Sequence, residues 1–111
     1  MFEQTRQGAV SVISGDEPLN AETVDSVREL LNSCTAEGRP AVVIDMKKIP
    51  LIDSAGLELL VESRQKCISR GGIVQLAAPD QLCRDILRVT GVDNLFELHD
   101  DVVAAVGSFA R

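Results

Sequence analysis

The chain of 111 residues contains no tryptophan, no tyrosine and only three phenylalanines. Its hydrophobic core must therefore be built mainly from Val, Ile, Leu and Ala. No apolar run approaches the ~20 residues that a membrane-spanning helix needs. The N-terminal sequence MFEQTRQG also lacks the basic start and apolar stretch of a secretory signal. These absences lead us to expect a cytoplasmic protein.

Basic residues are in the minority, with 11 Lys and Arg against 17 Asp and Glu and a net charge of −6. Nucleic acids and anionic membranes are bound mainly through an excess of Lys and Arg. We therefore expect neither of these as a partner. Apolar residues make up 45% of the chain and charged residues 25%, which is a globular balance.

Cysteines are few and widely spaced, at Cys34, Cys67 and Cys83. An odd number at this spacing does not indicate a disulfide framework, and no CxxC or Cys–His pattern indicates zinc. The acidic residues have no EF-hand spacing either, and helix caps and solvated surface account for them. We therefore expect packed or half-buried thiols and no metal site.

Segments with the composition of strands alternate with helical patterns along the whole chain. The expected strands are 2–5, 9–13, 41–45, 73–77 and 95–98. Asn20 is a good N-cap for a first helix in which Val24, Val27, Leu30, Leu31 and Cys34 share one face. The later helices carry helical spacings at Leu57, Leu60, Val61 and Ile68, then at Leu82, Ile86 and Val89, and last at Val102, Val103, Val106 and Phe109 after a cap at Asp100 or Asp101.

The order ββαβαβαβα with short connections predicts one α/β domain over residues 1–111. We expect a mainly parallel sheet of four or five strands, with about four helices. In such sheets functional sites gather beyond the carboxyl ends of the strands. The sequence IPLIDSAGLELL at 49–60 falls there, directly after the strand 41–45.

Motifs for catalysis are missing. His99 is the only histidine, is expected in a loop or at a helix start, and could meet Ser54 only by a coincidence of folding. DSAGL is not the G-x-S-x-G of a nucleophile elbow, and neither G-x-x-x-x-G-K-[ST] nor a G-x-G-x-x-G after a strand is present. We therefore expect no enzyme activity and no cofactor.

Asp53 and Ser54 stand side by side where the strand pattern changes to a helical one. Either side chain could cap the helix by accepting a free backbone N–H. One cap explains one polar residue and leaves the other unexplained. A serine at a helix N-terminus is also a good phosphoacceptor, because the free N–H groups and the helix dipole accommodate a dianion. The residues alone leave capping and modification of Ser54 equally open.

The sequence VVIDMKKIPLIDSAGLELLVESRQKCISRGGIVQLAAPDQLCRDILRVTGVDNLFEL, from Val42 to Leu98, resembles the STAS domain. This family is named for sulfate transporters and anti-sigma factor antagonists, and the short free-standing form is similar to the bacterial antagonists. The most specific piece is IDSAGL between a strand and a helix. RGG before a strand and VTGVDNLFEL after a helix add to it.

The resemblance implies that Ser54, directly after the motif aspartate, is the regulatory phosphoacceptor. Ala55 stands where the family often has a second Ser or Thr. The family's antagonist binds an anti-sigma factor with serine kinase activity, is released when that kinase phosphorylates it, and is restored by a PP2C-type phosphatase. The implied partner-binding residues are Leu51, Ile52, Asp53, Ser54, Ala55, Gly56, Leu57 and Glu58, with Asp16 or Glu17 as counterpart of an aspartate that many members carry before the first helix.

A second class of function follows from the same resemblance. Similar domains serve as constitutive scaffold subunits of lipid-transport ATP-binding-cassette complexes or of stress-sensing assemblies, where the serine could be only a cap. A third class, in which the domain itself binds a small ligand or hydrolyses nucleotide, has no motif to support it.

Overall fold

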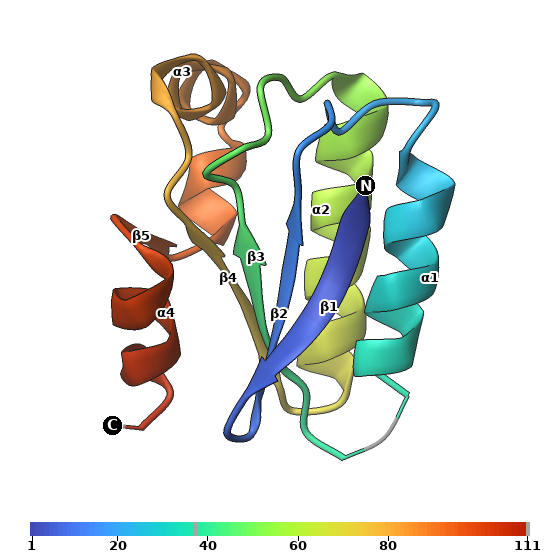
Figure 1. Ribbon diagram of the computed structural model, residues 1–111, viewed down its shortest axis with the longest axis vertical. Helices are drawn as coiled ribbons and strands as arrows, with labels where there is room; N and C mark the ends of the chain where they lie inside the picture. The colour runs from blue at the N-terminus through green and yellow to red at the C-terminus, as the bar shows by residue number, and fades with distance from the viewer. Residues whose placement is uncertain (37, 111) are drawn as a thin grey trace.

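The computed structural model describes residues 1–36 and 38–110. Its elements follow the predicted order ββαβαβαβα, with one 3₁₀ helix added before the last strand (Figure 1). They are β1 (Phe2–Gln7), β2 (Val10–Gly15), α1 (Val24–Cys34), β3 (Ala41–Asp45), α2 (Ser54–Ser69), β4 (Ile73–Ala77), α3 (Gln81–Thr90), η1 (Val92–Leu95), β5 (Leu98–His99) and α4 (Val102–Ser108).

The five strands form one sheet in the order β1-β2-β3-β4-β5. β1 and β2 are an antiparallel hairpin, and every later pair is parallel, so the prediction of a mainly parallel sheet is confirmed. The hairpin turns at Gly8, whose φ of +64° lies in the left-handed region that glycine adopts without strain. Parallel pairing places the carboxyl ends of β2, β3 and β4 at the same end of the sheet (Figure 1).

Helices cover the two faces of the sheet unequally. α1 and α2 lie on one face and α4 lies on the other (Figure 1). The larger core cluster joins the strand residues Ile13, Ile44 and Leu76 to α1, α2 and α3, and the smaller one joins Val43 and other strand residues to α4. Both clusters are dominated by aliphatic side chains, as the scarcity of aromatic residues predicts.

The first helix begins later than predicted. Asn20 does not cap it, because α1 begins at Val24 and its N-cap is Thr23. The Asn20 side chain instead accepts a hydrogen bond from the Glu22 N–H at 3.0 Å and so stabilises a turn. The preceding Leu19 is held in a β-bridge to Ile52, which forces the chain to turn before a helix can start.

The apolar faces of three helices differ from the predicted spacings. In α4, Val103 was predicted on the apolar face but is 78% exposed. α2 buries Gly56, Leu59, Leu60, Ser63 and Cys67. Of the residues predicted to share its face with Leu60, Leu57 and Val61 are only half-buried and Ile68 is 47% exposed. In α3 the buried residues are Cys83 and Leu87, whereas Leu82 and Val89 are exposed and Ile86 is half-buried. Several apolar residues of these helices therefore remain on the surface.

The last strand is shorter than the predicted segment 95–98. Gly91 ends α3 in the left-handed conformation, with φ of +78°, and the chain continues directly as the 3₁₀ helix η1. β5 consequently holds only Leu98 and His99, so the prediction of a loop or helix-start position for His99 is wrong. Asp101, one of the two predicted candidates, caps α4 by accepting a hydrogen bond from the Ala104 N–H at 2.7 Å.

The three thiols are packed as predicted. Cys67 and Cys83 are fully buried, and Cys34 is half-buried. Burial raises the pKa of Cys67 to about 11 and that of Cys83 to about 12. Within the described part of the chain, none of the helices combines the length and the apolar character needed to span a bilayer.

Candidate functional site: the N-terminus of helix α2

The segment between β3 and α2 is fixed by buried side chains. Met46, Ile49 and Ile52 are at most 2% exposed and anchor the segment in the larger core cluster. The Met46 N–H donates to the carbonyl of Ala77 at 2.8 Å, which ties the start of the segment to the end of β4. The chain therefore reaches α2 along a defined path rather than through a loose loop.

The loop between β2 and α1 is bonded to the chain just before α2. The Leu19 N–H donates to the Leu51 carbonyl at 2.8 Å, and the Asp53 N–H donates to the Leu19 carbonyl at 3.1 Å. Gly56 allows this close approach, because a Cβ at this position would lie 2.3 Å from the Leu19 carbonyl oxygen. Gly56 thus permits a close contact with the backbone of Leu19 in the same chain.

Asp53, and not Ser54, is the N-cap of α2. Its backbone is extended, and its Oδ1 accepts a hydrogen bond from the Gly56 N–H at 3.0 Å. The Asp53 carbonyl accepts from the Leu57 N–H at 2.9 Å. One of the two interpretations left open by the sequence, that Ser54 is present as the cap, is therefore removed.

Ser54 is the first residue of α2 and its side chain is exposed. No hydrogen bond joins its hydroxyl to another residue within 1–36 or 38–110. The N–H groups of Ser54 and Ala55 lie in the first turn, where helices leave backbone donors free. The hydroxyl therefore stands accessible beside free backbone donors.

The structure divides the predicted partner-binding residues between the surface and the interior. Leu51, Ser54 and Glu58 are exposed, and Asp53, Ala55 and Leu57 are half-buried. Ile52 is 2% exposed and Gly56 is buried, so these two residues position the site rather than present side chains on it.

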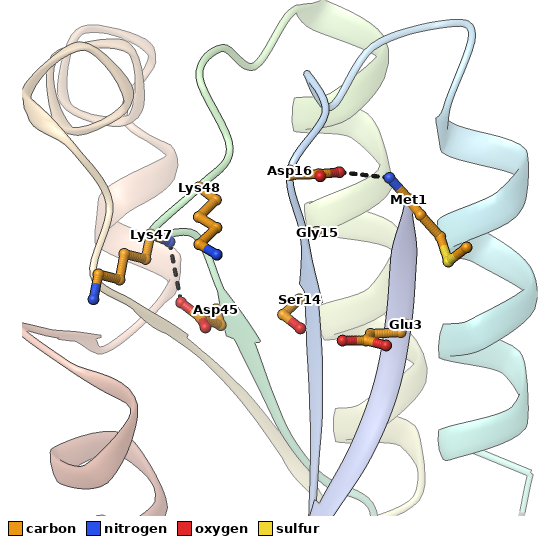
Figure 2. Close-up of a pocket in the computed structure, with 8 residues that line it drawn as sticks. All are labelled: Met1, Glu3, Ser14, Gly15, Asp16, Asp45, Lys47 and Lys48. Atoms are coloured by element: carbon orange, nitrogen blue, oxygen red, sulfur yellow. Dashed lines mark hydrogen bonds and ion pairs between the residues drawn. The ribbon is translucent and has the colours of Figure 1, made fainter.

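Asp16 and Glu17 follow β2 and are both exposed. The Met1 ammonium group lies 2.5 Å from Asp16 and 3.4 Å from Glu17, and its hydrogen bond lowers the pKa of Asp16. Asp16 lines a hollow of about 210 Å³ at the ends of β2 and β3, together with Lys47 and Lys48 (Figure 2). Among the described residues, no ion pair or hydrogen bond connects Asp16 or Glu17 to the segment 51–58.

The sequence interpretation missed a surface feature one turn beyond Ser54. Leu57, Glu58, Val61 and Glu62 of α2 line an open hollow of about 460 Å³ together with Val92 of η1. Its lining is almost wholly apolar apart from the two glutamates. The helical spacing of Leu57 and Val61 was visible in the sequence, but their exposure was not.

Comparison with known proteins agrees with this fold. The model of the STAS domain family matches residues 2–105. An anti-sigma factor antagonist from Mycobacterium paratuberculosis superposes with a TM-score of 0.88 at 23% identity, over 100% of this chain and 94% of that one. The Bacillus cell fate determinant SpoIIAA in its phosphorylated form gives a TM-score of 0.75 at 15% identity, over 98% and 99% of the two chains.

The same fold also occurs inside a much larger protein. The murine anion transporter Slc26a9 gives a TM-score of 0.77 at 15% identity, over 88% of this chain but only 17% of the transporter. No curated protein matches the chain in sequence at a significant level. Structural likeness at these identities establishes the fold alone, whereas the family match extends over nearly all of the sequence. The chain belongs to the STAS domain family.

Proposed function

We propose that this chain is an anti-sigma factor antagonist that acts by binding rather than by catalysis. In its unmodified form it binds an anti-sigma factor with serine kinase activity through the N-terminal end of α2. Phosphorylation of Ser54 by that kinase releases the complex, and a PP2C-type phosphatase restores binding. This activity would take place in the cytoplasm.

The observation that carries the proposal is the division of roles between Asp53 and Ser54. Asp53 already provides the cap of α2, so the exposed Ser54 hydroxyl has no structural task among the described residues. A kinase can therefore reach it without unfolding the site. Similar structures support the choice of partner, because they are structures of anti-sigma factor antagonists, among them SpoIIAA in unphosphorylated and phosphorylated forms.

A phosphate at Ser54 would change the surface more than the fold. It adds roughly −1.5 to −2 units of charge, which the free N–H groups and the dipole of α2 can accommodate. The same charge stands beside Asp53 and the exposed Glu58, so the local surface becomes strongly acidic. A partner seated there must then desolvate the phosphate and oppose this field. The usual coupling of such switches is about 5- to 150-fold in affinity.

The test is binding of the candidate anti-sigma kinase, measured by calorimetry, to the wild type, Ser54→Ala and Ser54→Asp. We expect Ser54→Ala to bind as the wild type does and Ser54→Asp to bind about 5- to 150-fold more weakly. Incubation with the kinase and ATP, followed by mass mapping, should place one phosphate on Ser54. Ser26→Asp is the control, because Ser26 is also exposed and lies in the first turn of α1.

Equal binding by Ser54→Ala and Ser54→Asp, or a phosphate mapped to another residue, would contradict the proposal. Recovery of a transporter ATPase in place of a kinase would favour the scaffold class of function. In that class the Ser54 variants would bind that ATPase equally well.

A further inference from the structure

We propose that the docking surface continues from Ser54 along α2 into the hollow between α2 and η1, and that this hollow receives an amphipathic helix of the partner. The partner helix would place apolar residues against Leu57, Val61 and Val92 and a basic residue against Glu58. This inference rests on the proposed function, since it describes where the same partner gains its affinity.

Ser54 and Val61 lie on one line along the outer side of α2. They are seven residues apart, which is two helical turns with a drift of only about 20° around the axis. The distance between them along the helix is about 10.5 Å at 1.5 Å per residue. The site of modification is thus at one end of a seam whose middle is the apolar hollow.

The hollow is an open, shallow apolar depression between two helical elements. Leu57 and Val61 on α2 and Val92 on η1 are each half-buried, and together with the two glutamates they line an open hollow of about 460 Å³. Both walls are helical elements, so no strand edge is available there for an added strand. Grooves of this kind bind an amphipathic helix through side chains spaced three, four and seven residues apart.

The charges at the rim favour a basic residue on the partner. Glu62 is already neutralised, because Arg28 Nε lies 3.0 Å and Lys66 Nζ 3.4 Å from its carboxylate. Glu58 is exposed and has no ion pair with any residue of 1–36 or 38–110. It is therefore the carboxylate at this rim that an incoming Lys or Arg would complement.

Separation along the helix makes Val61, at the far end of the hollow, energetically distinct from Ser54. The ~10.5 Å between Ser54 and Val61 exceeds the ~8 Å over which exposed charges interact at physiological ionic strength. Contacts at Val61 should therefore supply affinity in both states of Ser54, whereas the phosphate acts at the end of the seam and on the nearby Glu58. The effects of substitutions at the two positions should then multiply.

The experiment measures calorimetric binding of the candidate anti-sigma kinase to variants of the full chain. We expect Val61→Glu to bind at least ~30-fold more weakly and Val61→Thr, which keeps the shape of the side chain, several-fold more weakly. Glu58→Lys should cost about 10-fold and should remove part of the salt dependence. Val103→Glu should change affinity less than about 2-fold, because Val103 is 78% exposed on α4, across the sheet from α2.

Thermal unfolding of each variant establishes whether it is folded. If Val61→Glu is not folded, the test depends on Val61→Thr. If the folded Val61 and Glu58 variants bind with wild-type affinity while Ser54→Asp still binds more weakly, the hollow is not part of the docking surface. The proposed function would remain intact in that case. If the wild type itself does not bind the kinase, both proposals fail. If Val103→Glu weakens binding as much as Val61→Glu does, the inference about the hollow also fails, because the loss of affinity would then not be specific to the hollow.

Discussion

Replacement of Gly56 by alanine should destabilise the chain, although alanine is the better helix former. The added Cβ would lie 2.3 Å from the Leu19 carbonyl oxygen and 2.8 Å from Ile52 Cγ2. A carbon–oxygen contact is normally about 3.3 Å, so the Leu19 backbone must move away by about 1 Å. That movement strains the two hydrogen bonds that hold Leu19 to Leu51 and Asp53.

The expected change in the free energy of unfolding is the sum of opposing effects. Overpacking in a closed contact costs about 1–3 kcal/mol, and weakening one buried backbone hydrogen bond adds about 1 kcal/mol. The gain in helix propensity from Gly to Ala returns at most about 1 kcal/mol. The free energy of unfolding should therefore fall by about 1–3 kcal/mol, which lowers Tm by roughly 5–15 °C in a domain of this size.

Urea denaturation and differential scanning calorimetry measure this change directly. Gly107→Ala in α4 is the matched control, because an added Cβ there meets nothing within 4 Å. We expect this control to be neutral or stabilised by up to about 1 kcal/mol. A Gly56→Ala protein as stable as the wild type would refute the conclusion that the loop after β2 is locked against α2.

Two further predictions concern the cap of α2 and the buried thiols. Asp53→Ala should lower the free energy of unfolding by about 1 kcal/mol in urea denaturation, because the Gly56 N–H loses its acceptor; an unchanged midpoint would contradict the assignment of the cap. In native protein a thiol reagent should label Cys34 well before Cys67 and Cys83, which are fully buried. Because folding raises the pKa of Cys67 to about 11 and of Cys83 to about 12 from the ordinary thiol value of 9.0, both contribute full stability below pH 9 and lose it as the pH rises toward those values. A pH titration of the unfolding midpoint that stays flat above pH 9 would count against this.

The elements that the sequence predicted well are those with strong local signals. Strands 41–45 and 73–77 match β3 and β4, because continuous β-branched runs bounded by Pro or Gly have few alternatives. The left-handed Gly91 that ends α3 has an equally local cause, since glycine tolerates positive φ. Local chemistry alone determines these features.

The predictions that were wrong concern features that depend on contacts between distant segments. Asn20 is a good cap in isolation, but the bridge from Leu19 to Ile52 moves the helix start to a later residue. The sequence predicts that Leu57 and Val61 of α2 face the core, because they are apolar residues at helical spacing. Only the placement of η1 beside α2 shows that these residues line a surface hollow.

The candidate site combines a rigid backbone with an unoccupied side chain. Asp53 and Leu19 hold the start of α2 through backbone and cap hydrogen bonds, and none of these bonds uses the Ser54 hydroxyl. A modification at Ser54 can therefore alter charge without competing for any bond that maintains the fold. In the proposed function the two neighbouring polar residues have separate tasks: Asp53 maintains the conformation, and Ser54 is free to change the surface charge.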